Sequence, residues 1–344
     1  MWLQDIGHRM AHVLRYSTPL YPLEPAPGRN VTIGYTNTML NCRHSWTFIL
    51  RPVQPYRLRR TLLKQTRLGS EWYALTPFER WESSTYYGAT HLPFIGHVGI
   101  EARQLSARRL RVSVHFQRQL PAALRPYVRS TLERWLGVHE DLRDFYRLAH
   151  RSTGLRTAVA VFKGMRELRS IDLFETLVHC IALQRAGGGR TIRCMRQLCH
   201  AFGRQVAFGR HAIVAFPTAS TIASRSVREL RYATSLGFRA RFVLQTARAL
   251  RRHPTDPMLL ETLPKELLRQ HLRGQYKGLG DYALNILHPA GVPLDSWSVP
   301  AIANLMGVPA WSASFDMVAR RLTAVAPGLE RYAFSYLLNL AVLR

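Results

Sequence analysis

The spacing of apolar residues changes once along this chain. Up to about residue 120, apolar and polar residues alternate in short runs, of which RLRVSVHF (109–116) is the clearest. A period of two is typical of a strand with one buried face. Three further runs favour strands: WTFILRPV (46–53), EWYAL (71–75) and HVGIEA (97–102). We therefore predict an N-terminal domain over residues 1–125 that is built on an antiparallel β-sheet.

From Pro126 onward, apolar residues recur at helical spacing instead. The segments with this pattern are VRSTLERWLGV (128–138), HEDLRDFYRLAH (139–150), DLFETLVHCIALQ (172–184), RTIRCMRQLCHAF (190–202), SVRELRYATS (226–235), ARFVLQTARALRR (240–252) and LPKELLRQHL (263–272). Short linkers separate them, and no repeat of fixed period is present. We predict an all-α body over residues 126–344, in two lobes, and an α+β protein overall.

Charge narrows the class of partner. Lys and Arg number 48 against 21 acidic residues, so the formal charge is +27 in a chain of 344 residues that is 47% hydrophobic. Such an excess favours a polyanionic partner, and nearly all of it is Arg, which suits forked contacts to phosphate. No apolar run reaches the ~18 residues of a membrane-spanning helix. Nucleic acid is therefore the expected partner, and a membrane is not.

The N-terminus and the cysteines carry two further expectations. Residues 1–28 hold charged and polar side chains where a signal peptide has an apolar core, so we expect no export and, in a bacterium, a cytoplasmic, nucleoid-associated protein. Cys42, Cys180, Cys194 and Cys199 lack the paired spacing of a metal site. We expect buried thiols, with no metal and no cofactor.

The most informative segment is LRGQYKGLGDYALNILHPAGVPLDSW (272–297). A helix ends near Leu272, a Gly-x-Gly turn follows at 278–280, and an apolar helix begins. Glycines let backbone N–H groups approach a phosphate without obstruction, although plain helix ends use glycine as well. We predict a helix-hairpin-helix near 272–287 whose DNA contacts come from Lys277, Gly278, Leu279 and Gly280.

The hairpin is followed by VPLDSW (292–297), and this order resembles the helix-hairpin-helix (HhH-GPD) superfamily of DNA glycosylases. Over residues 130–344, the stretches 132–146, 164–184 and 235–250 look like segments of 8-oxoguanine DNA glycosylases, and LGFRARF (236–242) is similar to that family's turn into a helix. The resemblance implies an enzyme that flips a damaged base out of duplex DNA and cleaves its N-glycosidic bond. It also implies DNA contacts at Arg239 and Arg241.

The resemblance gives Asp295 the catalytic role. N-glycosidic cleavage builds positive charge on the sugar, which a nearby carboxylate stabilises while it orients water. The alternative is an aspartate that caps the next helix. Bifunctional relatives carry a lysine where this chain has Tyr282, so AP-lyase activity is not expected, and Lys277 remains a weak candidate for it.

Aromatic residues are the candidates for a base pocket. The resemblance implies that Tyr282 stacks on the flipped base, and Trp297, which follows Asp295, is a second candidate for the pocket wall. Core packing is the alternative for both. Trp311 and Phe315 have the same two interpretations. Two features depart from the family: Asp281 places a negative charge at the turn, and Tyr282 to Asp295 spans only 13 positions (295 − 282).

A base-flipping enzyme must fill the gap that the base leaves. The resemblance places the filling residue just after the helix FETLVHCIALQ, at Gln184, Arg185 or the loop containing Gly187–Gly189. The function we expect is a monomeric, monofunctional glycosylase that acts on an alkylated or oxidised purine in double-stranded DNA. The alternative is a catalytically inactive hairpin protein that binds distorted duplex.

Overall fold

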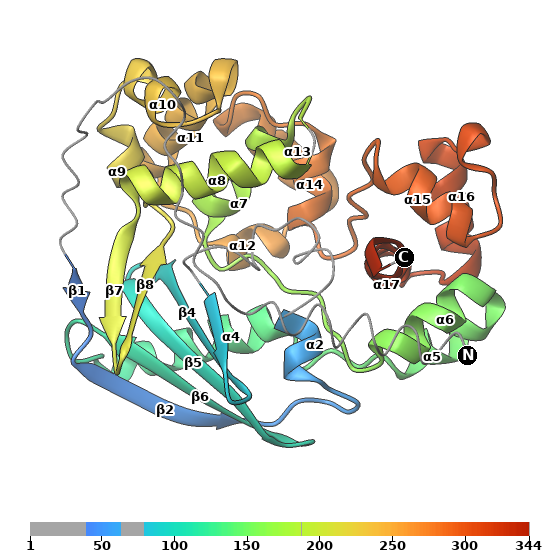
Figure 1. Cartoon of the computed structure of the whole chain (residues 1–344), viewed down its shortest axis with the longest axis horizontal. Coiled ribbons are helices and arrows are strands. Elements are labelled where there is room, and N and C mark those ends of the chain that lie inside the picture. The colour runs from blue at the N-terminus through green and yellow to red at the C-terminus, as the bar shows by residue number, and fades with distance from the viewer. Residues whose placement is uncertain (1–38, 63–78, 187, 344) are drawn as a thin grey trace. The chain divides into compact units, whose positions relative to one another are not determined.

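The computed structural model describes residues 39–62, 79–186 and 188–343, which belong to one compact unit beginning at Asn37 (Figure 1). The strand predicted at 71–75 lies outside the described residues. Among the described helices, none combines the length and apolar character needed to cross a membrane.

Five antiparallel strands form the larger sheet, in the order β2-β6-β5-β4-β3. Their bounds are β2 His44–Leu50, β3 Glu79–Glu82, β4 Thr85–Leu92, β5 Gly96–Ser106 and β6 Arg109–Phe116. The strands predicted at 46–53, 97–102 and 109–116 are confirmed. The sheet packs through Leu110, Val112 and Val114 against helices α2 (Leu58–Leu62) and α4 (Arg125–Leu136).

A second sheet of three strands was not predicted. It contains β1 (Leu40–Asn41), which pairs in parallel with β7 (Arg204–Phe208), and β8 (His211–Ala215), which pairs with β7 antiparallel. The β7–β8 hairpin interrupts the stretch for which only helices were predicted. Phe208 packs directly over Gly99 of β5, where a Cβ atom would lie 2.3 Å from its ring, so the two sheets touch closely. The α+β class is confirmed, with this hairpin as an addition to the helical body.

The first helical core is formed by the helices between residues 173 and 287. They are α7 Leu173–Leu183, α8 Gly188–Phe202, α9 Ala219–Ala223, α10 Val227–Ala233, α11 Ala240–Arg252, α12 Pro257–Glu261, α13 Lys265–Gln275 and α14 Asp281–Leu287, with a short 3₁₀ turn η3 at Gly237–Arg239. Polar caps start several of them: the Asp172 carboxylate accepts from the Phe174 N–H at 2.8 Å, and Ser226 with Glu229 forms a capping box.

The second helical core joins segments from both sides of the first. Its helices are α5 Arg143–Leu148, α6 Thr153–Phe162, α15 Ser298–Leu305, α16 Phe315–Val325 and α17 Glu330–Leu343, with the short turns η2 Ala149–Arg151 and η4 Ala310–Ser312. All seven helical segments predicted from the sequence are helices here. The chain crosses from the first core to the second between α14 and α15, where Val292 and Leu294 pack on the second core.

Candidate DNA-binding and catalytic site

The predicted hairpin joins α13 to α14, which lie against each other in the first helical core (Figure 1). Gly278 has a φ of +80°, and a Cβ atom there would lie 2.8 Å from the Phe242 ring, so this position requires glycine. Gly280 faces open space, with nothing within 4 Å of a Cβ position, and no side chain caps the helix that follows. Leu279 instead packs on the first core. The turn therefore presents bare backbone at the surface.

The charges at the turn explain how Asp281 is accommodated. Its carboxylate pairs with Arg269 at 3.3 Å and with Arg273 at 3.6 Å, both on α13. Exposed ion pairs of this kind add little stability, but they offset the negative charge locally. Lys277 is exposed just before the glycines. The surface offered by the turn is consequently not acidic.

Gln184, at the end of α7, is tied to the hairpin. Its side-chain amide donates to the Gly278 carbonyl, and its own carbonyl accepts from Arg239 Nε at 2.8 Å. Arg239 is only 2% exposed. The Arg239 guanidinium is thus held on the Gln184 carbonyl, and a direct DNA contact at Arg239 stays a prediction.

Arg241 and Arg185 lie at the surface on this side of the molecule. The Arg241 guanidinium lies 4.6 Å from the centre of the Phe242 ring, which is the ring that contacts Gly278. Arg185 follows Gln184 with a φ of +48°, a conformation that is strained for a residue with a side chain. Because the Gln184 side chain is bonded to the hairpin, Arg185 is the better placed of these two candidates for the residue that fills the gap. Residue 187 of the third candidate, the loop at 187–189, lies outside the described residues.

Asp295 caps α15 with one carboxylate oxygen. Oδ1 accepts from the backbone N–H of Trp297 at 3.0 Å and of Ser298 at 2.6 Å, and the Ser298 hydroxyl accepts in return from the Asp295 N–H at 2.8 Å. Oδ2 accepts no hydrogen bond from the part of the chain that the structure describes, and the residue is only half-buried. Asp295 therefore does cap the helix, through Oδ1, and its Oδ2 is left able to interact with another group.

Tyr282 belongs to the hairpin helix, thirteen positions before Asp295. It lies in the first turn of α14, and the pKa of its half-buried phenol is raised well above the ordinary range, first by burial and then by the charges of Cys180 and Asp295. Tyr282 is therefore a neutral aromatic side chain, and it carries no amine.

The other aromatic candidates are exposed. Trp297 is 53%, Phe315 53% and Trp311 89% exposed, so core packing is the wrong interpretation for all three. Trp297 lies two residues after Asp295 and donates its amide to it.

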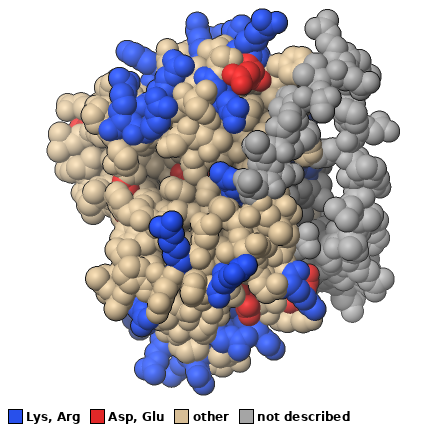
Figure 2. Space-filling model, turned by 90° about the vertical axis from the view of Figure 1, so that its left-hand side faces the viewer, with Lys and Arg blue, Asp and Glu red and all other residues tan. Residues whose placement is uncertain are grey.

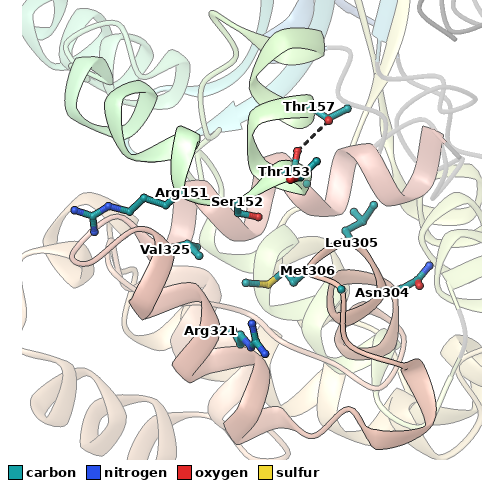
Figure 3. A pocket seen from close by; sticks show the side chains of 11 residues that line it. Arg151, Ser152, Thr153, Thr157, Asn304, Leu305, Met306, Arg321 and Val325 are labelled. Carbon is teal, nitrogen blue, oxygen red and sulfur yellow. Dashed lines mark hydrogen bonds between the residues drawn. The ribbon is translucent and has the colours of Figure 1, made fainter.

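A pocket of about 420 Å³ lies elsewhere, between α6, α15 and α16 (Figure 3). Its polar lining includes Arg151, Thr153 and Arg321, and Thr157 at its edge donates to the Thr153 carbonyl at 2.9 Å. The α15 residues that line it are at the C-terminal end of that helix, whereas Asp295 caps the N-terminal end. Eight residues of helix separate the two ends by ~12 Å. This pocket is not the Asp295 site.

Arginine is abundant on the molecular surface. Figure 2 shows far more Lys and Arg than Asp and Glu on the face that carries β1, β7, α9 and α10. The positive charge expected from the sequence is thus displayed outward, where a polyanion can meet it.

No protein-family model matches the sequence, and neither does any curated protein sequence. Solved structures do match. The 3-methyladenine DNA glycosylase from Archaeoglobus fulgidus aligns with a TM-score of 0.68 at 18% identity, over 86% of this chain and 98% of that one. The chain has a DNA-glycosylase fold.

Two further structures share it. The 8-oxoguanine glycosylase/lyase of Clostridium acetobutylicum, in complex with double-stranded DNA containing cytosine opposite 8-oxoguanine, gives a TM-score of 0.62 at 17% identity, over 86% of this chain and 94% of that one. MBOgg1 bound to a low-affinity DNA ligand gives 0.63 at 17%, over 86% and 95%. The N-terminal sheet and the helical body are both included in these alignments, since most of each chain is covered.

Proposed function

We propose that this protein is a monofunctional DNA glycosylase that excises a damaged purine, alkylated or oxidised, from duplex DNA. The observation that carries the proposal is the Asp295 carboxylate, which is held by two backbone N–H groups on Oδ1 while Oδ2 accepts no hydrogen bond from the described residues. It follows the glycine hairpin closely in the sequence, and the hairpin supplies a bare backbone surface for phosphate. The fold shared with glycosylases supports the assignment without deciding the substrate.

In the proposed reaction each residue has a limited task. Backbone amides at Gly278–Gly280 and the exposed Lys277 hold the phosphates, and Arg185 occupies the space of the extruded base. Trp297 and Tyr282 flank the flipped base. The Asp295 carboxylate stabilises the positive charge that develops on the sugar and orients the attacking water. Since no amine stands at position 282, the product is an intact abasic site.

One observation favours the alternative of a binding protein without catalysis. Two backbone N–H groups already occupy Asp295 Oδ1, as they would for an aspartate that only caps α15. In that case the protein would hold distorted duplex through the hairpin and release no base.

A panel of lesion duplexes tests the proposal. Duplexes carrying 3-methyladenine, 7-methylguanine, hypoxanthine, 8-oxoguanine or uracil are incubated with excess protein, and free base is measured by chromatography before any alkaline cleavage. Release of one of the damaged purines supports the proposal. Tight binding of the same duplexes with no base released at any of them would refute it and support the binding protein.

A further inference from the structure

We infer that Arg331, on the C-terminal helix α17, is a positioning residue that sets Asp295 against the hairpin helix; this inference rests on the proposed function. Asp295 caps α15 in the second helical core, whereas Tyr282 belongs to α14 in the first. The chain links the two only through residues 288–294. Something must fix that link for the carboxylate to keep its place.

Arg331 makes the fixing contacts. Its Nη1 donates to the carbonyls of Asn285 at 3.0 Å, His288 at 2.8 Å and Gly291 at 3.2 Å, and its Nη2 donates to that of Ile286 at 3.2 Å. The side chain is only 7% exposed. Charge-assisted hydrogen bonds of this kind are stronger than neutral ones. Two of the carbonyls, those of Asn285 and Ile286, lie in the last turn of α14, where carbonyls have no partner within the helix.

The segment over residues 288–294 is folded closely against the end of α14, where Arg331 binds. Gly291 packs so tightly on the end of α14 that a Cβ atom would lie 2.3 Å from the Asn285 carbonyl oxygen, and its N–H donates to the His288 carbonyl at 2.9 Å. Arg169 adds a long contact of 3.5 Å to the Pro289 carbonyl. The chain therefore turns back at once after a hairpin helix of only seven residues.

Through its position on α17, Arg331 connects the first and second helical cores. It lies in the first turn of α17, and α17 packs against α15, the helix that Asp295 caps. One helix thus packs against the helix that Asp295 caps and holds the end of α14 through Arg331. Since misplacement of a catalytic group by about 1 Å can cost on the order of 10²-fold in rate, loss of the clamp should be visible in catalysis.

Arg331→Met removes the donors while keeping the apolar stem, and Arg166→Met is its matched control. Arg166 is also fully buried and also donates to backbone carbonyls, of Val53 at 2.9 Å and Glu140 at 3.2 Å, but these join the sheet domain to the segment after α4. Both variants should melt at lower temperature. We expect Arg331→Met alone to slow single-turnover excision, by about 10- to 100-fold, with unchanged affinity for a duplex containing a tetrahydrofuran abasic analogue.

A double-mutant cycle separates positioning from general damage. If Arg331 acts through Asp295, Arg331→Met should slow excision little further in an Asp295→Asn background. Full additivity, or a wild-type rate in folded Arg331→Met, would overturn the inference. Arg331→Lys restores one ammonium donor and should recover part of the rate; it also carries the test if the Met variant does not fold.

Hydrogen–deuterium exchange gives a readout independent of activity. In Arg331→Met the amides of His288, Gly291 and Leu294 should lose protection, whereas in Arg166→Met they should keep it. Retained protection would refute the clamp even if excision fell. If wild-type protein released no base from any duplex, the proposed function would fail, while the exchange result would still decide whether Arg331 holds this segment.

Discussion

Replacing Asp295 by Asn separates charge from shape at the candidate catalytic position. The amide oxygen can still accept from the Trp297 and Ser298 N–H groups, which now lie 3.0 and 2.6 Å from Oδ1. The cap is therefore kept, and stability should fall only by the interaction of a carboxylate with a helix N-terminus, about 0.3–1 kcal/mol. The charge that faces the sugar is lost, which typically costs on the order of 10²–10³ in rate.

The assay compares release of free base under single-turnover conditions with a melting curve for each protein, on a duplex that the wild type processes. Asp256→Asn is the matched control, because Asp256 also caps a helix, α12, where it accepts from the Met258 N–H at 2.8 Å. We expect the control to excise at the wild-type rate. Wild-type excision by a well-folded Asp295→Asn variant would refute the catalytic role.

Four further predictions concern DNA binding, the cleavage chemistry and the pH dependence of stability. The logarithm of the DNA binding constant should fall linearly with the logarithm of salt concentration, and Lys277→Ala should reduce that slope by about one unit; an affinity that is indifferent to salt would contradict the phosphate role. Gly278→Ala should weaken binding, because the added carbon would lie 2.8 Å from the Phe242 ring at a φ of +80°, and a gel-shift titration checks it. Borohydride should trap no covalent adduct with an abasic duplex, and a trapped adduct that Lys277→Ala abolishes would show that a lysine is the nucleophile. Burial depresses the pKa of His97 and of His179 to about 4, from an ordinary value of 6.5. Because the unfolded chain takes up protons at a higher pH than the folded one, the free energy of unfolding should decline as pH falls from about 6.5 towards 4. Denaturant titrations should show a smaller decline for His97→Gln.

Regular spacing of apolar residues made much of the fold predictable. Two hairpins were missed, because their turns were not recognised in the sequence. Strand β6 was found at its observed bounds because RLRVSVHF alternates without interruption. The β3–β4 hairpin was missed because its turn is Ser83–Ser84, with φ of +44° and +67°, and two serines give none of the usual Asn-Gly or Asp-Gly signal. The β7–β8 hairpin did carry a signal, alternating residues around Gly209–Arg210, that the flanking helices obscured.

Only those residues of the candidate site that stand close together in the sequence were predictable. The glycines, Lys277, Tyr282 and Asp295 stand within twenty residues of one another, so one motif names them all. The surroundings of Arg239 were not predictable, because sequence shows that an arginine precedes a helix but not that its guanidinium is buried against Gln184. Arg331 gave no signal, since a buried donor to backbone carbonyls has no characteristic neighbours in the sequence.

The segment from Tyr282 to Asp295 is shorter than the family's, and the structure shows how the chain accommodates this length. A longer helix would carry the chain further before it returns, whereas here α14 ends after seven residues and Arg331 binds its last carbonyls. The cap on Asp295 belongs to the same arrangement. A carboxylate that stabilises a sugar cation must be held in one rotamer, and two amides on Oδ1 hold it there while leaving Oδ2 without a donor from the described residues. Capping and catalysis therefore demand the same geometry at Asp295, and only the removal of its charge distinguishes them.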